Sequence, residues 1–145
     1  MKRVLIFQIL VFLLFVSQSF SNSKFGFGFG YPFLSLKYSP IEVKYATGEG
    51  IDVFAGRIYC LNLIKKEKIK CFTGIEAGYI KFDTLDMKGT GYEGSLFLGM
   101  EYFISKKISF MIDFSPTFID LKSTDDYEID GFEMVVNFAI YFYFK

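Results

Sequence analysis

The stretch Gly131–Lys145, GFEMVVNFAIYFYFK, decides the fold of this chain. Its even-numbered positions are all large and apolar: Phe132, Met134, Val136, Phe138, Ile140, Phe142 and Phe144. Its odd-numbered positions after Gly131 are polar, small or amphipathic: Glu133, Val135, Asn137, Ala139, Tyr141 and Tyr143. Side chains on a β-strand alternate between two faces, so the stretch predicts a strand with one fully hydrophobic face. Such a face needs an apolar medium over its whole length, either a second sheet or lipid.

The same alternation recurs along the chain and predicts an all-β protein. Clear strands are expected at about 33–38, 41–46, 51–63, 69–82, 91–104, 108–121 and 131–144. Lys24–Gly30, where phenylalanine alternates with glycine, supplies an eighth strand and so the even count that bacterial single-chain barrels usually have. A single long first strand over residues 24–38 is the alternative. The turn spacing predicts an antiparallel up-and-down β-barrel with eight strands.

The two faces of the predicted strands indicate which medium surrounds the barrel. The polar face mixes a few charges with glycine, alanine and serine, as a narrow interior filled by side chains requires. The other face carries too many phenylalanine and leucine side chains for the interior of an eight-stranded barrel. Strands of about 14 residues also suit tilted membrane strands, which need roughly 9–11 residues in lipid. We therefore expect a transmembrane barrel with its apolar face outside.

The predicted connections fall into two groups at opposite ends of the barrel. Residues 65–68 and 105–107 form tight basic turns at the end where the chain finishes. Residues 47–50, 83–91 and 123–130 form longer and mostly acidic loops at the other end. Outer-membrane barrels have short periplasmic turns and longer outer loops, so the basic end is expected to be periplasmic.

The N-terminus predicts export from the cytoplasm. Residues 1–21 combine basic Lys2 and Arg3, an apolar run and small residues at Ser19 and Ser21, as in a cleaved signal peptide. The run is shorter than the roughly 20 residues that a spanning helix needs. Removal of this segment changes the formal net charge from 0 to −2 and leaves residues 22–145 as one barrel domain. No polybasic patch indicates a nucleic-acid partner.

The signal peptide, the alternating strands, the two kinds of connection and the aromatic last strand together resemble the small bacterial outer-membrane β-barrel family, of the OmpA-transmembrane-domain and OmpX type. The resemblance covers residues 22–145 and includes no diagnostic short motif. It implies a bacterial outer-membrane location, with outer-membrane lipid and the barrel assembly machinery as partners. It also implies that Tyr143 and Phe144 form the assembly signal, although Lys145 follows them and departs from the family's usual ending.

Charged side chains on the inner face predict a lumen charge network. Its expected members are Arg57, Glu76, Glu93, Glu101, Asp113 and Glu133. Buried charges need partners, and the hairpin around residues 65–68 places Arg57 directly opposite Glu76. The acids outnumber the bases, so Lys37 and Lys44 are the expected further partners. A carboxylate catalytic cluster and a cation path are the alternatives to a network that plugs the interior.

Two further features leave alternatives open. Cys60 and Cys71 lie on one hairpin and one face, so they form either a disulfide, which export permits, or two small apolar side chains near the lipid boundary. Pro116 interrupts the strand 108–121, and polar residues are odd-numbered before it but even-numbered after it. That change of phase indicates either a β-bulge or a strand leaving the membrane.

The sequence argues against an enzyme. It contains no histidine, which removes the Ser-His and Cys-His nucleophile arrangements and the usual metal ligand. Enzymes of the resembling architecture rely on a histidine. We expect no catalytic residues, cofactor or metal, and a monomer with a structural, surface or adhesion-type role. The alternatives are a soluble periplasmic β-barrel that binds an apolar ligand and a narrow outer-membrane channel.

Overall fold

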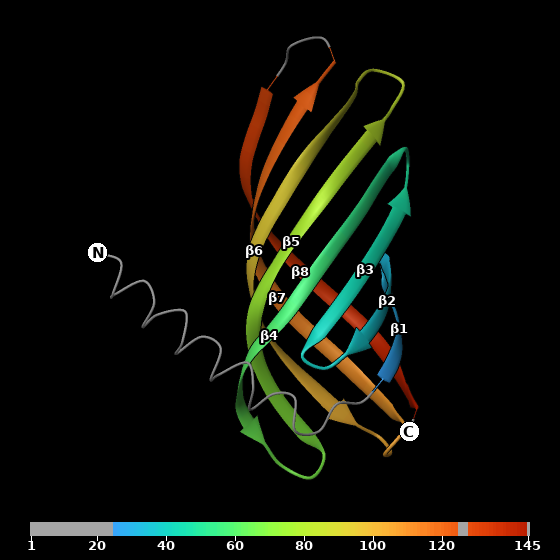
Figure 1. The fold of residues 1–145 in the computed structure, drawn as a ribbon, viewed down its shortest axis with the longest axis vertical. Coiled ribbons are helices and arrows are strands. Elements are labelled where there is room, and N and C mark those ends of the chain that lie inside the picture. Colours follow the sequence, from blue (N-terminus) through green and yellow to red (C-terminus); the bar gives the residue numbers. More distant parts are fainter. Residues whose placement is uncertain (1–24, 125–127, 145) are drawn as a thin grey trace, which may run out of the picture.

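The computed structural model describes residues 25–124 and 128–144, and these form one closed antiparallel barrel (Figure 1). The predicted signal peptide, residues 1–21, lies outside the described residues. The strands are β1 (Phe25–Tyr31), β2 (Phe33–Tyr38), β3 (Ile41–Gly48), β4 (Ile51–Lys65), β5 (Ile69–Asp83), β6 (Lys88–Phe103), β7 (Ile108–Ser123) and β8 (Glu128–Phe144). Each strand pairs with the next, and β8 closes the sheet against β1. The predicted eight-stranded up-and-down barrel is confirmed, and the alternative of one long first strand is wrong because β1 and β2 pair as a hairpin.

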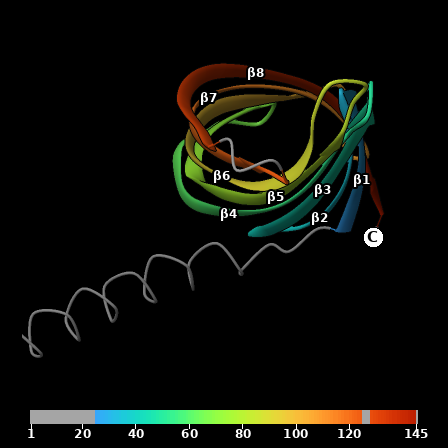
Figure 2. The same ribbon diagram turned by 90° about the horizontal axis from the view of Figure 1, so that it is seen from above.

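The register around the barrel sets how steeply the strands tilt. One continuous row of paired residues runs through Gly26, Lys37, Glu42, Arg57, Glu76, Ser95, Thr117 and Glu133. On its other side Gly26 pairs with Tyr143, so one circuit returns to β8 ten residues from where the row ends. For eight strands this stagger gives a tilt of about 40° and an interior just wide enough for side chains to fill. Viewed along its length, the barrel surrounds a single interior (Figure 2).

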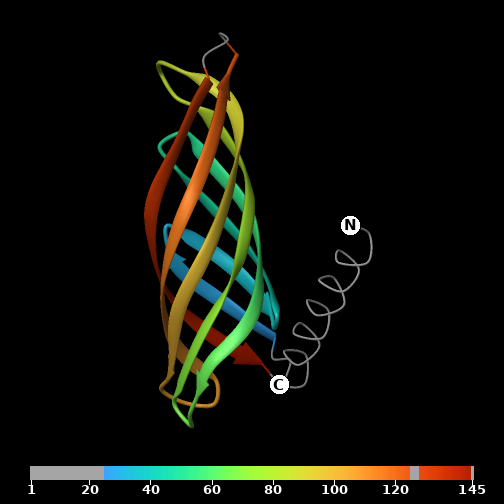
Figure 3. The ribbon, with the colours of Figure 1, turned by 90° about the vertical axis from the view of Figure 1, so that its left-hand side faces the viewer.

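The strands differ in length, so the barrel wall is uneven. β1 to β3 have between six and eight residues, whereas β4 to β8 have between fifteen and seventeen. The upper ends of the hairpins therefore descend in steps from β7–β8 to β1–β2 (Figure 1). Figure 3 shows β7 and β8 rising well above the short β1 and β2. No helix within residues 25–124 or 128–144 is long and apolar enough to cross a membrane.

The connections lie at the two ends of the barrel as the sequence predicts, but their lengths differ from the prediction. The turns at residues 39–40, 66–68 and 104–107 lie at the end where β8 finishes. At the other end the connections are Pro32 and residues 49–50, 84–87 and 124–127, the last two short because β6 and β8 begin earlier than expected. The prediction of longer loops at that end is wrong. Residues assigned to polar loops, such as Lys88–Thr90, extend the strands instead.

The outer surface carries an apolar band whose upper limit is marked by aromatic rings. On β5 and β6 the last outward rings, Tyr79 and Tyr92, have centroids 5.7 Å apart. Immediately above them the outward residues of the same strands are exposed and polar: Lys81, Asp83, Lys88 and Thr90. The inner face changes in the opposite sense, because Ile80 and Phe82 are buried there with exposed fractions of 6% and 5%. The polarity of the two faces therefore inverts at one height along the barrel.

The same inversion explains the change of phase around Pro116. β7 pairs with β8 in unbroken register through Pro116, which lies opposite Met134, so the expected β-bulge is wrong. Thr117 points inward and Phe118 outward, as parity requires. Above them the outer face carries Lys122, whose ammonium lies 2.7 Å from the Glu128 carboxylate. The hydrogen bond from Lys122 holds the pKa of the exposed Glu128 carboxyl below its usual range. The even-numbered residues of β7 face outward throughout. They become polar above Phe118 because the surroundings of the outer face change at that height.

Candidate functional site

The interior of the barrel is the candidate functional site, because nearly all buried polar side chains gather there. They come from seven of the eight strands and from both halves of the chain: Ser35, Lys37, Glu42, Lys44, Arg57, Glu76, Glu101, Ser109, Asp113, Ser115, Thr117 and Asn137. A closed barrel of this stagger turns alternate residues of every strand toward one narrow space. Charges that are far apart in the sequence are thereby brought within bonding distance.

Arg57 is the centre of this network and is fully buried. Its Nε donates to Glu76, which lies directly opposite on β5. Its Nη1 and Nη2 donate to the two carboxylate oxygens of Asp113 on β7, at 2.7 and 3.0 Å. The predicted pairing of Arg57 with Glu76 is confirmed. The fork-like contact with Asp113 uses the planar guanidinium geometry that favours arginine over lysine at such sites.

Two lysines complete the ion pairs, as the excess of acids in the sequence predicts. Lys44 Nζ lies 3.1 Å from Glu76, so this carboxylate contacts both Lys44 and Arg57. Lys37 Nζ lies 3.2 Å from Glu101 on the far side of the barrel. Both pairs are nearly excluded from solvent. Interactions between charges are screened much less in such a place than at a surface.

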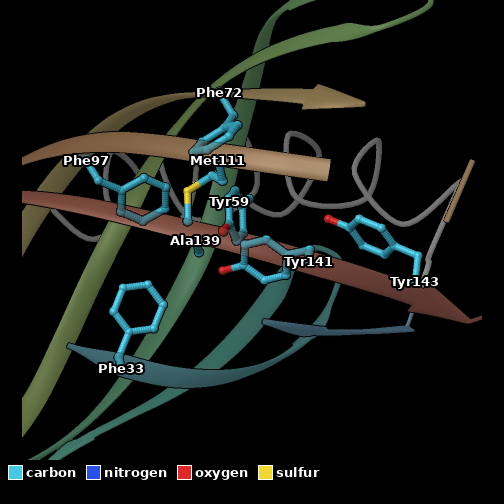
Figure 4. Close-up of a cluster of buried hydrophobic side chains, with 8 residues drawn as sticks. All are labelled: Phe33, Tyr59, Phe72, Phe97, Met111, Ala139, Tyr141 and Tyr143. Atoms are coloured by element: carbon cyan, nitrogen blue, oxygen red, sulfur yellow. The ribbon is translucent and has the colours of Figure 1, made fainter. Parts of the chain in front are cut away.

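A layer of aromatic side chains fills the interior beside the charges, and the sequence interpretation did not name most of it. Figure 4 shows its members gathered in the interior: Phe33, Tyr59, Phe72, Phe97, Met111, Ala139, Tyr141 and Tyr143. The Lys37 ammonium lies 4.4 Å from the Tyr59 ring centroid and 4.7 Å from that of Tyr141. A cation over an aromatic face is attracted by the ring's negative face. Shared parity with Arg57 and Glu76 is the signal that places Tyr59 and Phe72 inside.

Tyrosine hydroxyls supply the remaining partners of the buried carboxylates. Glu42 accepts hydrogen bonds from Tyr59 and Tyr141, and Glu101 accepts one from Tyr143. Ser109 Oγ also donates to Glu101, at 2.5 Å. Because each buried carboxylate has several donors, the cost of removing it from water is offset.

Glycine on the inner face makes room for these rings. A Cβ atom at Gly99 would lie 2.6 Å from the Phe72 ring and 2.7 Å from the Cβ of Asp113. A Cβ at Gly28 would lie 2.6 Å from the Tyr141 ring. Real Cβ atoms do not approach other heavy atoms this closely, so larger residues would displace the filling. The mixture of glycine and charge on this face is therefore what a filled interior requires.

Of the six predicted network members, Glu133 lies outside the network and Glu93 lies at its margin. Glu133 faces Thr117 on the inner side but is exposed, and within the described residues it forms no ion pair. Its inclusion was wrong because it lies too far up the barrel to reach Arg57. Glu93 is half-buried against Gly78 and has no ion pair among the described residues, but its carboxylate interacts electrostatically with Lys44 and Arg57. Arg57, Glu76, Glu101 and Asp113 are network members as predicted.

The two cysteines are free thiols, so the disulfide alternative is wrong. Cys71 lies opposite Ile64 on β4, four residues beyond Cys60. Two irregularities in the β4–β5 register, after Tyr59 and after Asn62, move the strands past each other. Four residues of strand correspond to about 13 Å, far beyond the reach of a disulfide.

The last strand places its two terminal aromatic residues on opposite faces. Tyr143 is buried in the interior, whereas Phe144 is exposed on the outer face, opposite Phe25 of β1. Their role as an assembly signal stays a prediction.

The interior consists of tightly paired charges. Within the part of the chain that the structure describes, no three His, Cys, Asp or Glu side chains are placed to hold a metal ion. The central charges have exposed fractions near zero. What this arrangement does physically is fill the barrel and lock its strands together across the interior.

Replacing Glu76 with leucine is expected to lower the melting temperature of the folded protein. The change removes a partner from both Arg57 and Lys44, but the guanidinium keeps its two bonds to Asp113. Loss of one partner in a buried pair costs on the order of 2–3 kcal/mol when part of the pairing survives. Thermal unfolding followed by circular dichroism measures the change, and an unaltered melting curve would show that the pairing carries no stability.

A search for relatives found no match to this chain among protein-family models, curated proteins or solved structures. The function must therefore be argued from the geometry.

Proposed function

We propose that this chain is a monomeric bacterial outer-membrane β-barrel, similar to the OmpA transmembrane domain and OmpX, with a side-chain-filled interior and a structural or surface role. The observation that carries the proposal is the polarity of the two faces. Large apolar side chains are exposed all around the lower barrel, for example Leu98 at 53%, Phe114 at 49% and Phe138 at 56%. Ion pairs are buried inside at the same height. A protein in water has the opposite arrangement.

The dimensions of the apolar band support a membrane span. On β6 the outward residues from Tyr92 to Tyr102 are aromatic at both ends and apolar or small between. This stretch of eleven residues rises about 25 Å at a tilt near 40°, which matches the height of the apolar band in outer-membrane barrels. Aromatic girdles at both limits are typical of that class.

The polarity inversion supports an end that projects into water. Above Tyr79 and Tyr92 the outer face becomes charged and the inner face becomes apolar, as in a soluble barrel. β5 to β8 continue above this boundary and present lysine and carboxylate side chains to solvent. Such a projecting rim fits a structural or surface role.

The soluble periplasmic barrel receives less support, since its phenylalanine face would have to surround an apolar ligand inside. The exposed phenylalanines lie on the outside, and the interior holds Lys37, Arg57 and their carboxylates. A narrow channel receives no support from an interior whose central charges are fully buried.

Fractionation of expressing bacteria tests the proposal. The protein is expected in the outer-membrane fraction after a carbonate wash, and its unheated detergent sample is expected to migrate differently from a boiled one. Closed barrels resist unfolding by detergent until they are heated because every strand is paired within the ring. A soluble periplasmic protein serves as the control. Recovery of this chain with that control, without detergent, would overturn the proposal.

A further inference from the structure

One long edge of the barrel sheet has no neighbour. β8 pairs with β7 along its whole length, but its other edge pairs with β1 only from Phe138 to Phe144. β1 ends at Tyr31, opposite Phe138, and the chain turns at Pro32 into β2. Within the described residues, no strand pairs with that edge of β8 from residue 128 to residue 137, and we call these residues the open edge.

Part of the open edge lies at the height of the apolar band. Its outward side chains Phe132, Met134 and Val136 have exposed fractions of 69%, 64% and 40%. If the proposed function is right, which this inference assumes, residues 132–137 border hydrocarbon. Backbone N–H and C=O groups without partners cost several kcal/mol each in hydrocarbon, and lipid-exposed sheet edges do not occur there. A partner that supplies hydrogen bonds to the open edge would therefore be stabilised strongly there.

An added strand could continue the sheet beside the open edge. Below Pro32, β1 and β2 lie between β8 and β3; above it, no described strand pairs with the open edge. A lipid acyl chain beside the open edge would offer it no hydrogen bonds. An extended peptide would pair with it as a new strand, which is a general mode of peptide recognition.

The charge on the open edge specifies the chemistry of that strand. Glu133 lies on the inner face of the open edge itself, is exposed and forms no ion pair among the described residues. The interior cations Lys37, Lys44 and Arg57 are already paired with other carboxylates. An added strand thus needs a basic residue on its inward face.

A second copy of this chain does not fit the open edge. Two barrels inserted in the same direction are related by a two-fold axis along the membrane normal. Because each strand tilts by about 40°, that axis would make the two open edges cross at about 80° instead of pairing. On the far side of β1 and β2, β3 offers only Thr47 and Gly48 beyond its pairing with β2, too short an edge for a stable strand pair.

We infer that the open edge of β8 is a docking site for a β-strand of a different polypeptide. That strand alternates apolar side chains facing lipid with inward residues that include lysine or arginine. Its backbone completes the sheet, and its cation meets Glu133.

Amide hydrogen exchange tests the inference with a defined probe. The probe is a ten-residue peptide that alternates valine with lysine, and the control is the same peptide methylated on every backbone nitrogen. The protein is purified folded in detergent, and its barrel is verified by the gel shift and circular dichroism. Without peptide, alternate amides of residues 129–137 are expected to exchange faster than amides of residues 138–143. The unmethylated peptide is expected to slow them at least about tenfold, since a paired amide exchanges only when its hydrogen bond opens.

Charge and backbone contributions are then separated. The variant Glu133→Gln is expected to weaken peptide binding about tenfold, as loss of an interface charge partner does. The methylated peptide is expected to protect nothing. The inference is overturned if the open edge is already protected without peptide, if the methylated peptide protects equally, or if neither peptide protects. It is also overturned if chemical cross-linking finds dimers joined through β8. These readouts come from the folded barrel, so they stand apart from the cell fractionation that tests the membrane location.

Discussion

Replacing Arg57 with leucine is expected to destabilise the barrel by about 3–5 kcal/mol, because the change leaves buried carboxylates without their cation. Arg57 is fully buried and holds Glu76 through Nε and Asp113 through both terminal nitrogens. Asp113 keeps Asn137 and Ser115 as donors, and Glu76 keeps Lys44, but neither set replaces the guanidinium. The loss should therefore exceed that of Glu76→Leu.

The measurement is unfolding by urea in detergent or lipid vesicles, followed by circular dichroism or the gel shift because the chain has no tryptophan. Lys88→Leu is the matched control. It also removes a cation, but Lys88 and its partner Asp83 are 65% and 57% exposed, and such pairs contribute about 1 kcal/mol or less. The triple variant Arg57→Leu, Glu76→Leu, Asp113→Leu should recover part of the lost stability. It removes both carboxylates together with their shared cation, so that within this cluster only Lys44 loses its partner. Equal effects of Arg57→Leu and Lys88→Leu would contradict the central role of the network.

An arginine at residue 98 is expected to cost about 2–4 kcal/mol in a lipid bilayer, whereas an arginine at residue 90 should cost about 0–1 kcal/mol. Leu98 and Thr90 lie on the outer face of β6 and are both exposed. Leu98 lies midway between Tyr92 and Tyr102, and Thr90 lies above Tyr92. The two variants add the same charge to the same strand, so only depth in the bilayer distinguishes them.

Unfolding of Leu98→Arg and Thr90→Arg in lipid vesicles gives the comparison directly. If the barrel resided in water, both changes would fall on an exposed surface and stay within about 0.5 kcal/mol of the parent. Matching small effects at residues 98 and 90 would thus count against the membrane location. A large cost at residue 90 would place the boundary above the tyrosines instead of beside them.

The local alternation of side chains was enough to predict the strands, the closed barrel and the pairing of Arg57 with Glu76. These depend on a period of two and on the symmetry of one short hairpin, both of which are visible in a continuous stretch of sequence. The same parity placed Lys37 and Lys44 inside. The same parity holds for Tyr59 and Phe72, which a prediction based on charged residues alone did not include.

The errors have non-local causes. Whether Glu133 reaches Arg57 depends on the stagger of the whole barrel, which emerges only when β8 closes against β1. Two irregularities that no single residue in the hairpin indicates increase the separation of Cys60 from Cys71 from two residues to four. The pattern around Pro116 was ambiguous because a bulge and an inversion of the surroundings change the sequence phase in the same way. Only the unbroken register separates the two.

The short first strand also has a kinetic consequence. The seam between β1 and β8 extends only from Phe25 to Tyr31, whereas β5 and β6 pair from Ile69 to Asp83. The seam joins residues more than a hundred positions apart, so its formation bears the largest loop-closure entropy. In return it forms only seven residue pairs, against fifteen between β5 and β6. The hairpins can form independently of one another, but the ring cannot close until β1 pairs with β8. Ring closure is therefore expected to be the slow step of folding, and the same seam is where the native ring should first come apart.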